Sequence, residues 1–165
     1  MSRHGIVIGV AAVVAVDQAV KALVRADVAQ GSVRELLPGI DLVHTKNTGV
    51  SFGFLADAPA WVVGLTSTAA LVIVVALLAR VAPGKPGRVA AALIAGGALG
   101  NLIDRIALGS VTDFLDLPLL PPCNIADVAI TFGALTMAVA ILLTPDDRAH
   151  PASGAGQVAK NGSDG

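Results

Sequence analysis

Residues 58–79 read APAWVVGLTSTAALVIVVALLA and contain no charged side chain. At about 1.5 Å of rise per residue, a helix of this length covers the roughly 30 Å hydrocarbon core of a bilayer. The whole chain fits that environment, since 55% of its 165 residues are hydrophobic, 14% are charged, and the mean hydropathy is +0.78. A soluble domain usually carries about a quarter charged residues. The sequence therefore predicts an integral membrane protein.

Three further apolar segments accompany this one, at about residues 5–24, 88–108 and 124–144. The first is uncharged only as far as Val16, so a helix that crosses the bilayer must also include Asp17 and Lys21. Because these two lie four residues apart, they share a helix face and can form an ion pair. A secretory signal peptide is the alternative explanation of this segment. The cleavage region of a signal peptide consists of small, neutral residues, whereas Asp17 and Lys21 stand at that place here. We expect four transmembrane helices.

Basic residues indicate the orientation of these helices. The connection between the second and third segments carries Arg80, Lys85 and Arg88 and no acidic residue. By the positive-inside rule this connection is cytoplasmic, and four spans then place both termini in the cytoplasm. The same topology brings four aspartates to the outer face of the membrane. They are Asp17, Asp104, Asp113 and Asp127.

The connection at residues 25–57 is long enough to form local structure. Val33–Leu37 and Ile40–Val43 have the composition of short strands. We expect a small extracytoplasmic β-sheet lying on the membrane surface. The predicted fold class is an all-α integral membrane protein with four transmembrane helices and this sheet in its first outer connection. Residues 1–144 would form a single domain, and residues 145–165 a disordered cytoplasmic tail.

The stretch between the third and fourth segments is acidic. Carboxylates at the edge of a bilayer are costly, so they indicate function. Two that converge in a low-dielectric site can share one proton and act as acid and base. Asp104 is better explained as an ionised partner of Arg105 or of another cation, and Asp116 receives no role. Asp113 and Asp127 remain as the candidate pair.

Simpler structural explanations exist for parts of this stretch. Asn124 and Asp127 also fit a helix N-cap followed by an acid in the first turn. Taken alone, Asp113 is a loop aspartate. Gly96 and Gly100, four residues apart in an apolar helix, predict close packing of helices through small residues. The capping explanation does not exclude a catalytic role for Asp127.

Other chemistries find little support in the sequence. Residues 49–53 match the pattern Gly-x-Ser-x-Gly, but this chain is too short and too apolar to form the α/β sheet that the motif requires. Of the three histidines, only His44 would reach the outer face, and no His-Glu-x-x-His motif is present, which argues against zinc. Cys123 is the single cysteine, so no internal disulfide forms. A net charge of -1 argues against nucleic acid as a partner.

Five motifs in order, over residues of about 5–144, resemble one known family. They are Asp17-Gln18-Ala19-Val20-Lys21, Asn47-Thr48-Gly49 through Phe52, Gly96 through Arg105, Val111-Thr112-Asp113-Phe114, and Asn124-Ile125-Ala126-Asp127. With four apolar spans, this set resembles lipoprotein signal peptidase, also called signal peptidase II, the aspartic protease family of bacterial membranes. The resemblance implies that Asp113 and Asp127 are the catalytic dyad. It also implies supporting or substrate-binding roles for Asp17, Lys21, Asn47, Gly49, Asn101, Asp104, Arg105 and Asn124.

The resemblance implies the reaction as well. A monomeric endopeptidase in the cytoplasmic membrane of a bacterium would remove the signal peptide from a prolipoprotein, just before a diacylglyceryl-modified cysteine, with its active site at the outer face. Membrane lipid is an implied partner, and no cofactor or metal is needed. Cys123 departs from the family pattern, which has an aromatic residue there, and Lys46 stands where a Tyr is common. These departures concern loop packing more than the dyad.

Two other functions fit the acidic residues. An ion- or proton-coupled transporter would use carboxylates inside the membrane, but it would distribute them through the membrane depth. A non-catalytic membrane subunit could be held together by the pairs Asp17–Lys21 and Asp104–Arg105. The second alternative leaves Asp113 and Asp127 without a role.

Overall fold

The computed structural model describes residues 3–48, 62, 69, 73, 76 and 84–143. Its helices are α1 (Arg3–Asp27), α3 (Lys85–Leu108) and α4 (Ile125–Leu142), and its strands are β1 (Val33–Leu37), β2 (Ile40–Asn47) and β3 (Val111–Asp116). All three helices are long and apolar enough to cross a bilayer, where the sequence predicts the first, third and fourth spans. The remaining predicted span, 58–79, lies outside the described residues except for four isolated helical positions. Gly49 and the predicted tail at 145–165 also lie outside them.

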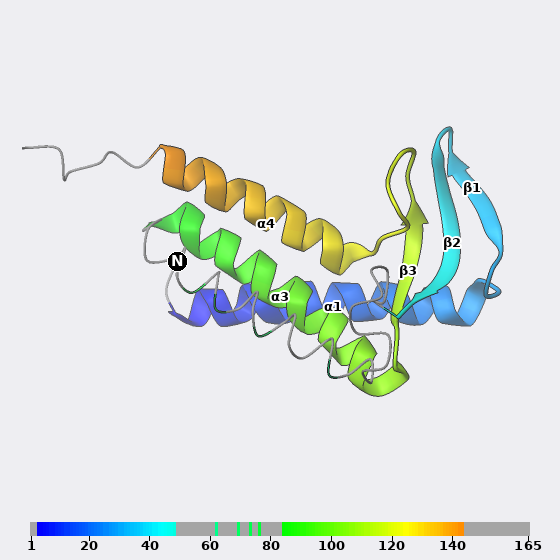
Figure 1. Cartoon of the computed structure of the whole chain (residues 1–165). Coiled ribbons are helices and arrows are strands. Elements are labelled where there is room, and N and C mark those ends of the chain that lie inside the picture. The colour runs from blue at the N-terminus through cyan, green and yellow to red at the C-terminus, as the bar shows by residue number, and fades with distance from the viewer. Residues whose placement is uncertain are drawn as a thin grey trace, which may run out of the picture.

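Helix α3 packs against both α1 and α4, and it crosses α1 in the view of Figure 1. Glycine allows this close approach. A Cβ atom at Gly96 would come within 2.7 Å of the Val13 side chain on α1, and one at Gly97 would overlap the Ala126 carbonyl on α4. A Cβ atom at Gly100 would lie 2.7 Å from the Asp17 carboxylate. The predicted packing through small residues is therefore confirmed.

The sheet is antiparallel, in the order β1-β2-β3. Its strands stand across the end of the helices where α1 ends and α4 begins, away from the N-terminus (Figure 1). Strands β1 and β2 lie in the connection after α1, as predicted. The sheet extends beyond that connection, however, because β3 comes from the connection between α3 and α4. All four residues at 111–114 are buried, so polar and apolar residues do not alternate there. This alternation is the sequence pattern that usually indicates a strand.

Apolar packing joins the sheet to α1. Phe114 on β3 is buried together with Val24 and Val28 at the end of α1. His44 on β2 is buried too, and its Nδ1 atom lies 2.8 Å from the Val28 carbonyl oxygen, one of the carbonyls that a helix end leaves without an intrahelical partner. His44 is thus a structural residue. These contacts fix β3, and with it Asp113, against the helices.

Candidate active site

A buried lysine organises the polar residues between α1 and α3. Lys21 is 0% exposed, and its Nζ atom lies 2.9 Å from Asp17 Oδ2 and 3.4 Å from Asp104 Oδ2. The same ammonium donates a hydrogen bond of 2.9 Å to Asn101 Oδ1. The predicted ion pair between Asp17 and Lys21 is present. Because a buried charge is costly unless it is paired, these residues stabilise the fold only as a set.

Asp104 finds its cations on α1. Besides Lys21 it lies 3.7 Å from Arg25 Nη1, and its Oδ2 atom accepts a hydrogen bond of 3.0 Å from the Thr112 backbone N–H. Of the two alternatives that the sequence left open for Asp104, the other cations are therefore its partners, and not Arg105. Neighbouring residues on a helix point in different directions, whereas Lys21 and Arg25 both lie on the face of α1 that meets α3. Within the described part of the chain, the buried Arg105 Nε atom has no hydrogen-bond partner.

Two residues on α1 were not predicted as part of this cluster. Gln18 Nε2 lies within hydrogen-bond distance of Asp17 Oδ2, the Gly100 carbonyl oxygen and Asp104 Oδ1, at 3.2, 3.0 and 3.1 Å. Arg25 Nη1 donates to Thr112 Oγ1 at 3.1 Å. Residues 18, 21 and 25 follow the i, i+3, i+7 spacing of one helix face, and that spacing was the available signal.

Asp17 and Asp104 each connect the helices α1 and α3 to a further element, α4 for Asp17 and β3 for Asp104. Asp17 Oδ1 accepts a hydrogen bond of 2.9 Å from the Ala126 backbone N–H in the first turn of α4. A carboxylate is favourable there, because the first N–H groups of a helix lack intrahelical partners and carry partial positive charge. Asp104 holds the Thr112 N–H of β3 in the same way. The residues so held directly precede Asp127 and Asp113.

Asp127 completes the cap of α4. Its backbone N–H donates to Asn124 Oδ1 at 3.1 Å, and its own Oδ2 atom accepts from the Asn124 backbone N–H at 3.2 Å, which is a capping box. Its other oxygen, Oδ1, accepts a hydrogen bond of 2.8 Å from Asn101 Nδ2. The predicted N-cap is therefore confirmed. The cap holds Oδ2 of the Asp127 carboxylate, and Asn101 on α3 holds Oδ1.

Asp113 lies on β3 and is 2% exposed. Its Oδ1 atom accepts a hydrogen bond of 2.7 Å from Asn124 Nδ2, and its Oδ2 atom accepts one of 3.0 Å from Asn47 Nδ2. Burial raises the pKa of the Asp113 carboxyl, the two amide hydrogen bonds oppose that rise, and the negative charge of Asp127 adds to it. A carboxyl in this setting retains its proton more readily than a solvated one.

Cys123 lies beside these two aspartates. Its backbone pairs with Leu115, which closes the proline-rich connection between β3 and α4. Burial, followed by the charges of Asp127 and Asp113, raises the pKa of the Cys123 thiol. Since the thiolate is the nucleophilic form, this environment does not activate Cys123.

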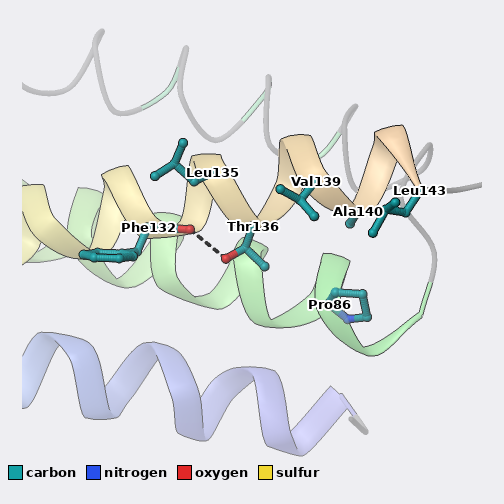
Figure 2. A pocket seen from close by; sticks show the side chains of 7 residues that line it. All are labelled: Pro86, Phe132, Leu135, Thr136, Val139, Ala140 and Leu143. Carbon is teal, nitrogen blue, oxygen red and sulfur yellow. Dashed lines mark hydrogen bonds between the residues drawn. The ribbon is translucent and has the colours of Figure 1, made fainter.

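The described residues also form a pocket of about 460 Å³ at the other end of the helices. It lies between the first turn of α3 and the second half of α4 (Figure 2). Among the described residues that line it, Thr136 has the one polar side chain, and its hydroxyl already donates to the Phe132 carbonyl oxygen at 2.7 Å. These lining residues include no titratable group, so we place the candidate chemistry with the aspartates at the sheet end.

The order of the motifs and their geometry agree with a sequence comparison. The model of the family described as signal peptidase (SPase) II matches residues 9–143. The chain belongs to the signal peptidase II family. It is thus an enzyme of the aspartic signal peptidase type and a bacterial membrane protein. The transporter alternative receives no support.

Curated members of the signal peptidase II family are similar over most of their length. The chain is 40% identical to the lipoprotein signal peptidase of Moorella thermoacetica over 136 residues, which covers 79% of this chain and 88% of that protein. It is 42% identical to that of Tolumonas auensis over 131 residues, 74% of this chain and 80% of the relative. A bacterial membrane enzyme solved by the in meso method at 1.9 Å resolution has a TM-score of 0.71 and 25% identity, covering 87% of this chain and 96% of its own.

Proposed function

We propose that this chain is an aspartic endopeptidase that removes signal peptides from prolipoproteins, and that Asp113 and Asp127 are its catalytic dyad. The observation that carries the proposal is the side chain of Asn124, which donates to Asp113 Oδ1 and accepts from the Asp127 backbone N–H. Asn124 thereby connects the two residues, since its backbone N–H also donates to Asp127 Oδ2. Among the described residues, neither carboxylate forms an ion pair with Lys or Arg, so a proton can be exchanged between them.

Hydrolysis needs one neutral and one ionised carboxyl group. The ionised carboxylate takes a proton from water as its oxygen attacks the scissile carbonyl carbon, while the neutral carboxyl donates its proton to the carbonyl oxygen. When the tetrahedral intermediate collapses, the C–N bond breaks and the leaving amine receives a proton. The products are a signal peptide with a new carboxylate and a lipoprotein with a free amino terminus. Two carboxyl groups complete this cycle.

The proposed substrate is a prolipoprotein with a diacylglyceryl-modified cysteine directly after the scissile bond. Its acyl chains keep the substrate in the bilayer, where a site at the end of three membrane-length helices can reach it. Residues 1–144 are proposed as one domain of four transmembrane helices, in a monomer with both termini in the cytoplasm and the dyad at the outer face. The basic residues Lys85 and Arg88 support this orientation, since they begin α3 at the end opposite the sheet (Figure 1).

A cleavage assay on the full chain tests the proposal. The purified protein in lipid vesicles is incubated with a synthetic prolipoprotein peptide that carries diacylglyceryl-cysteine, and the products are identified by mass. We expect cleavage directly before the modified cysteine, and loss of cleavage in Asp113→Asn and Asp127→Asn. The matched control is Asp116→Asn, which changes the other aspartate of β3 and leaves cleavage unchanged. Near-normal cleavage by either dyad variant would overturn the assignment.

A further inference from the structure

Two turns of the sheet carry large apolar side chains that are exposed. Residues 36–40 read LLPGI, from the end of β1 to the start of β2, and residues 117–122 read LPLLPP, between β3 and α4. Neither turn contains a charged residue. Four of their leucines are between 49% and 103% exposed: Leu36, Leu37, Leu119 and Leu120. Apolar side chains that are exposed together indicate an interaction surface.

The two turns belong to one surface. Asp41 on β2 pairs with Asp116 on β3, so the start of β2 and the end of β3 lie at the same end of the sheet. A Cβ atom at Gly39 would lie 3.4 Å from Pro118 Cγ, so the turns are close neighbours. In Figure 1 both turns are at the top of the sheet, away from the last turn of α1. We call residues 36–40 and 117–122 together the leucine tip.

Leu119 has a backbone conformation that leucine rarely adopts. Its φ angle is 67°, in the left-handed region, and among the described residues it is the one residue other than glycine with a positive φ. This conformation costs free energy for a side chain of this size. Leu119 is also fully exposed, so no packing within the described part of the chain offsets that cost. A contact outside the chain would explain why a leucine is held in this place.

The backbone of the second turn is suited to an apolar environment. Pro118, Pro121 and Pro122 have no backbone N–H, and the N–H of Leu120 donates to the Leu117 carbonyl oxygen at 3.2 Å. A backbone N–H group that leaves water without a partner is costly. Because this turn has few such groups, it can leave water more easily than an ordinary turn.

The position of the sheet along α1 agrees with a place beside the membrane. The 25 residues of α1 span about 37 Å, which exceeds the hydrocarbon core of about 30 Å but not the whole bilayer of about 40–45 Å. The sheet packs on the last turns of α1, where Phe114 contacts Val24 and Val28. A sheet at this place would lie at the depth of the lipid head groups. In Figure 1 the leucine tip projects beyond α4, over the region that lipid would occupy.

We infer that the leucine tip inserts into the lipid leaflet at the sheet end of the helices and anchors the sheet there. The partner is the bilayer itself, through its glycerol and acyl-chain region. The second turn leads directly into α4, whose exposed side chains Phe132, Leu135 and Val139 form lipid-facing surface in a membrane protein. The tip thus continues a surface that already contacts lipid. This inference goes beyond the proposed function and does not depend on it.

The charges behind the tip favour an apolar contact over binding of anionic head groups. Glu35, Asp41 and Asp116 lie opposite one another on β1, β2 and β3. Arg34 is the one basic residue in the stretches 34–41 and 116–122. Because the local charge is negative, anionic lipid would be repelled and not attracted. Insertion should therefore depend little on the charge of the lipid and on salt.

The test measures the surroundings of a fluorescent label on the leucine tip. Cys123→Ser removes the single native cysteine, Leu119→Cys then provides the attachment site, and the full chain is placed in phosphatidylcholine nanodiscs, which leave both faces open to solvent. We expect blue-shifted emission that spin-labelled lipids quench and iodide quenches little. The matched control is Gln30→Cys in the same background, an exposed position in the turn between α1 and β1. There we expect iodide to quench and the lipids to quench less.

A second measurement tests whether the two turns insert as one surface. The label is moved to Leu37→Cys, and the other turn is made polar by Leu119→Ser and Leu120→Ser. Both serines replace exposed side chains, so folding is retained, and unfolding curves in detergent check this. We expect lipid quenching at position 37 to fall. Leu108→Ser, an exposed leucine at the end of α3, should leave it unchanged.

Three outcomes would overturn the inference. Iodide quenching without lipid quenching at position 119 would place the tip in water. Protection from both quenchers would show that protein covers the tip, as in contact with a second copy of this chain. Lipid quenching that appears only with added phosphatidylglycerol, and is lost in high salt, would indicate head-group binding. Each outcome leaves the proposed cleavage activity untouched, because none of these measurements uses the substrate.

Discussion

Two pairs of aspartates in this protein have different surroundings. Asp17 and Asp104 face the cations Lys21 and Arg25 at 2.9 to 3.7 Å. Asp113 and Asp127 are held by amides and a backbone N–H, without a cation among the described residues. A carboxylate paired with a cation stays ionised, whereas one held by amides can exchange its proton. The partner, and not the residue type, therefore separates the two structural aspartates from the two that we propose to be catalytic.

The first pair also supports the second. Asp104 accepts the backbone N–H of Thr112, directly before Asp113, and Asp17 accepts that of Ala126, directly before Asp127. Each structural aspartate thus fixes the backbone from which one dyad side chain projects. Catalysis by two carboxyl groups requires positions accurate to a fraction of an ångström, and α1 and α3 supply them.

The largest expected effect is a loss of activity without a loss of stability when a proposed dyad residue is changed. In Asp113→Asn we expect cleavage to fall by at least about 10³-fold, as general acid–base catalysis is lost. The midpoint of thermal unfolding in detergent should stay within a few degrees, since the variant removes no cation pair. Cleavage assays and unfolding curves on the same preparation check this. A variant that is inactive because it is unfolded would contradict it.

The next effect is the opposite one: changing an aspartate of the structural pair should lower stability more than activity. Asp104→Ala leaves Arg25 and the Thr112 N–H without their carboxylate, and breaking a buried charge network by removing one partner costs about 3–5 kcal/mol. We expect a clear fall in the free energy of unfolding in detergent. Activity measured well below the new unfolding midpoint should fall much less than in Asp113→Asn. Equal losses of activity in both variants would remove the distinction between the pairs.

Much of this comparison could be predicted from the sequence. The apolar lengths place three of the helices, and the charges of Asp17 and Lys21 within a membrane-length segment predict their ion pair. The capping box of Asn124 and Asp127 is equally local, because it depends on residues three apart. Features that depend on neighbours within one helix or strand are visible in the sequence.

The partners of Asp104 and the strand that carries Asp113 were not predictable in this way. Asp104 contacts cations on another helix. The adjacent Arg105, one of the two alternatives, is not its partner because a helix turns neighbouring side chains about 100° apart. Strand β3 is buried along residues 111–114, so it lacks the alternation that marks a strand. Contacts between distant segments decide both features, and no local pattern records them.

Two glycines on α3 offer a finer test of the comparison. Each lies against a residue of one aspartate pair or against the residue that precedes it. A Cβ atom at Gly100 would lie 2.7 Å from Asp17 Oδ2, and one at Gly97 would overlap the Ala126 carbonyl before Asp127. We expect each Ala substitution to destabilise the protein by about 1–3 kcal/mol, as overpacking does. Gly9→Ala is the control, since its nearest contact would be an alanine methyl at 3.2 Å.

These two substitutions should differ in activity as well. Gly97→Ala shifts the turn of α4 that carries Asp127, so it should lower kcat even where the protein is folded. Gly100→Ala displaces the Asp17 side chain and should act mainly on the unfolding midpoint. Measured kcat and unfolding curves check the difference. If Gly100→Ala proved the more damaging to kcat, the two pairs would not act separately.

The smallest expected effect concerns stability and pH. Because the pKa of Asp113 is raised from 3.8 in the folded protein, the folded state binds this proton more tightly than the unfolded state. The stability that Asp113 contributes is therefore complete below about pH 3.8 and is lost as pH rises through the higher folded value. Asp113→Asn cannot titrate, so its stability relative to the original protein should improve over that rise. Unfolding midpoints of both proteins across this range check the sign, with Thr45→Val on β2 as a control that keeps the carboxyl group. Parallel curves for Asp113→Asn and the original protein would show that the dyad proton is not held at Asp113.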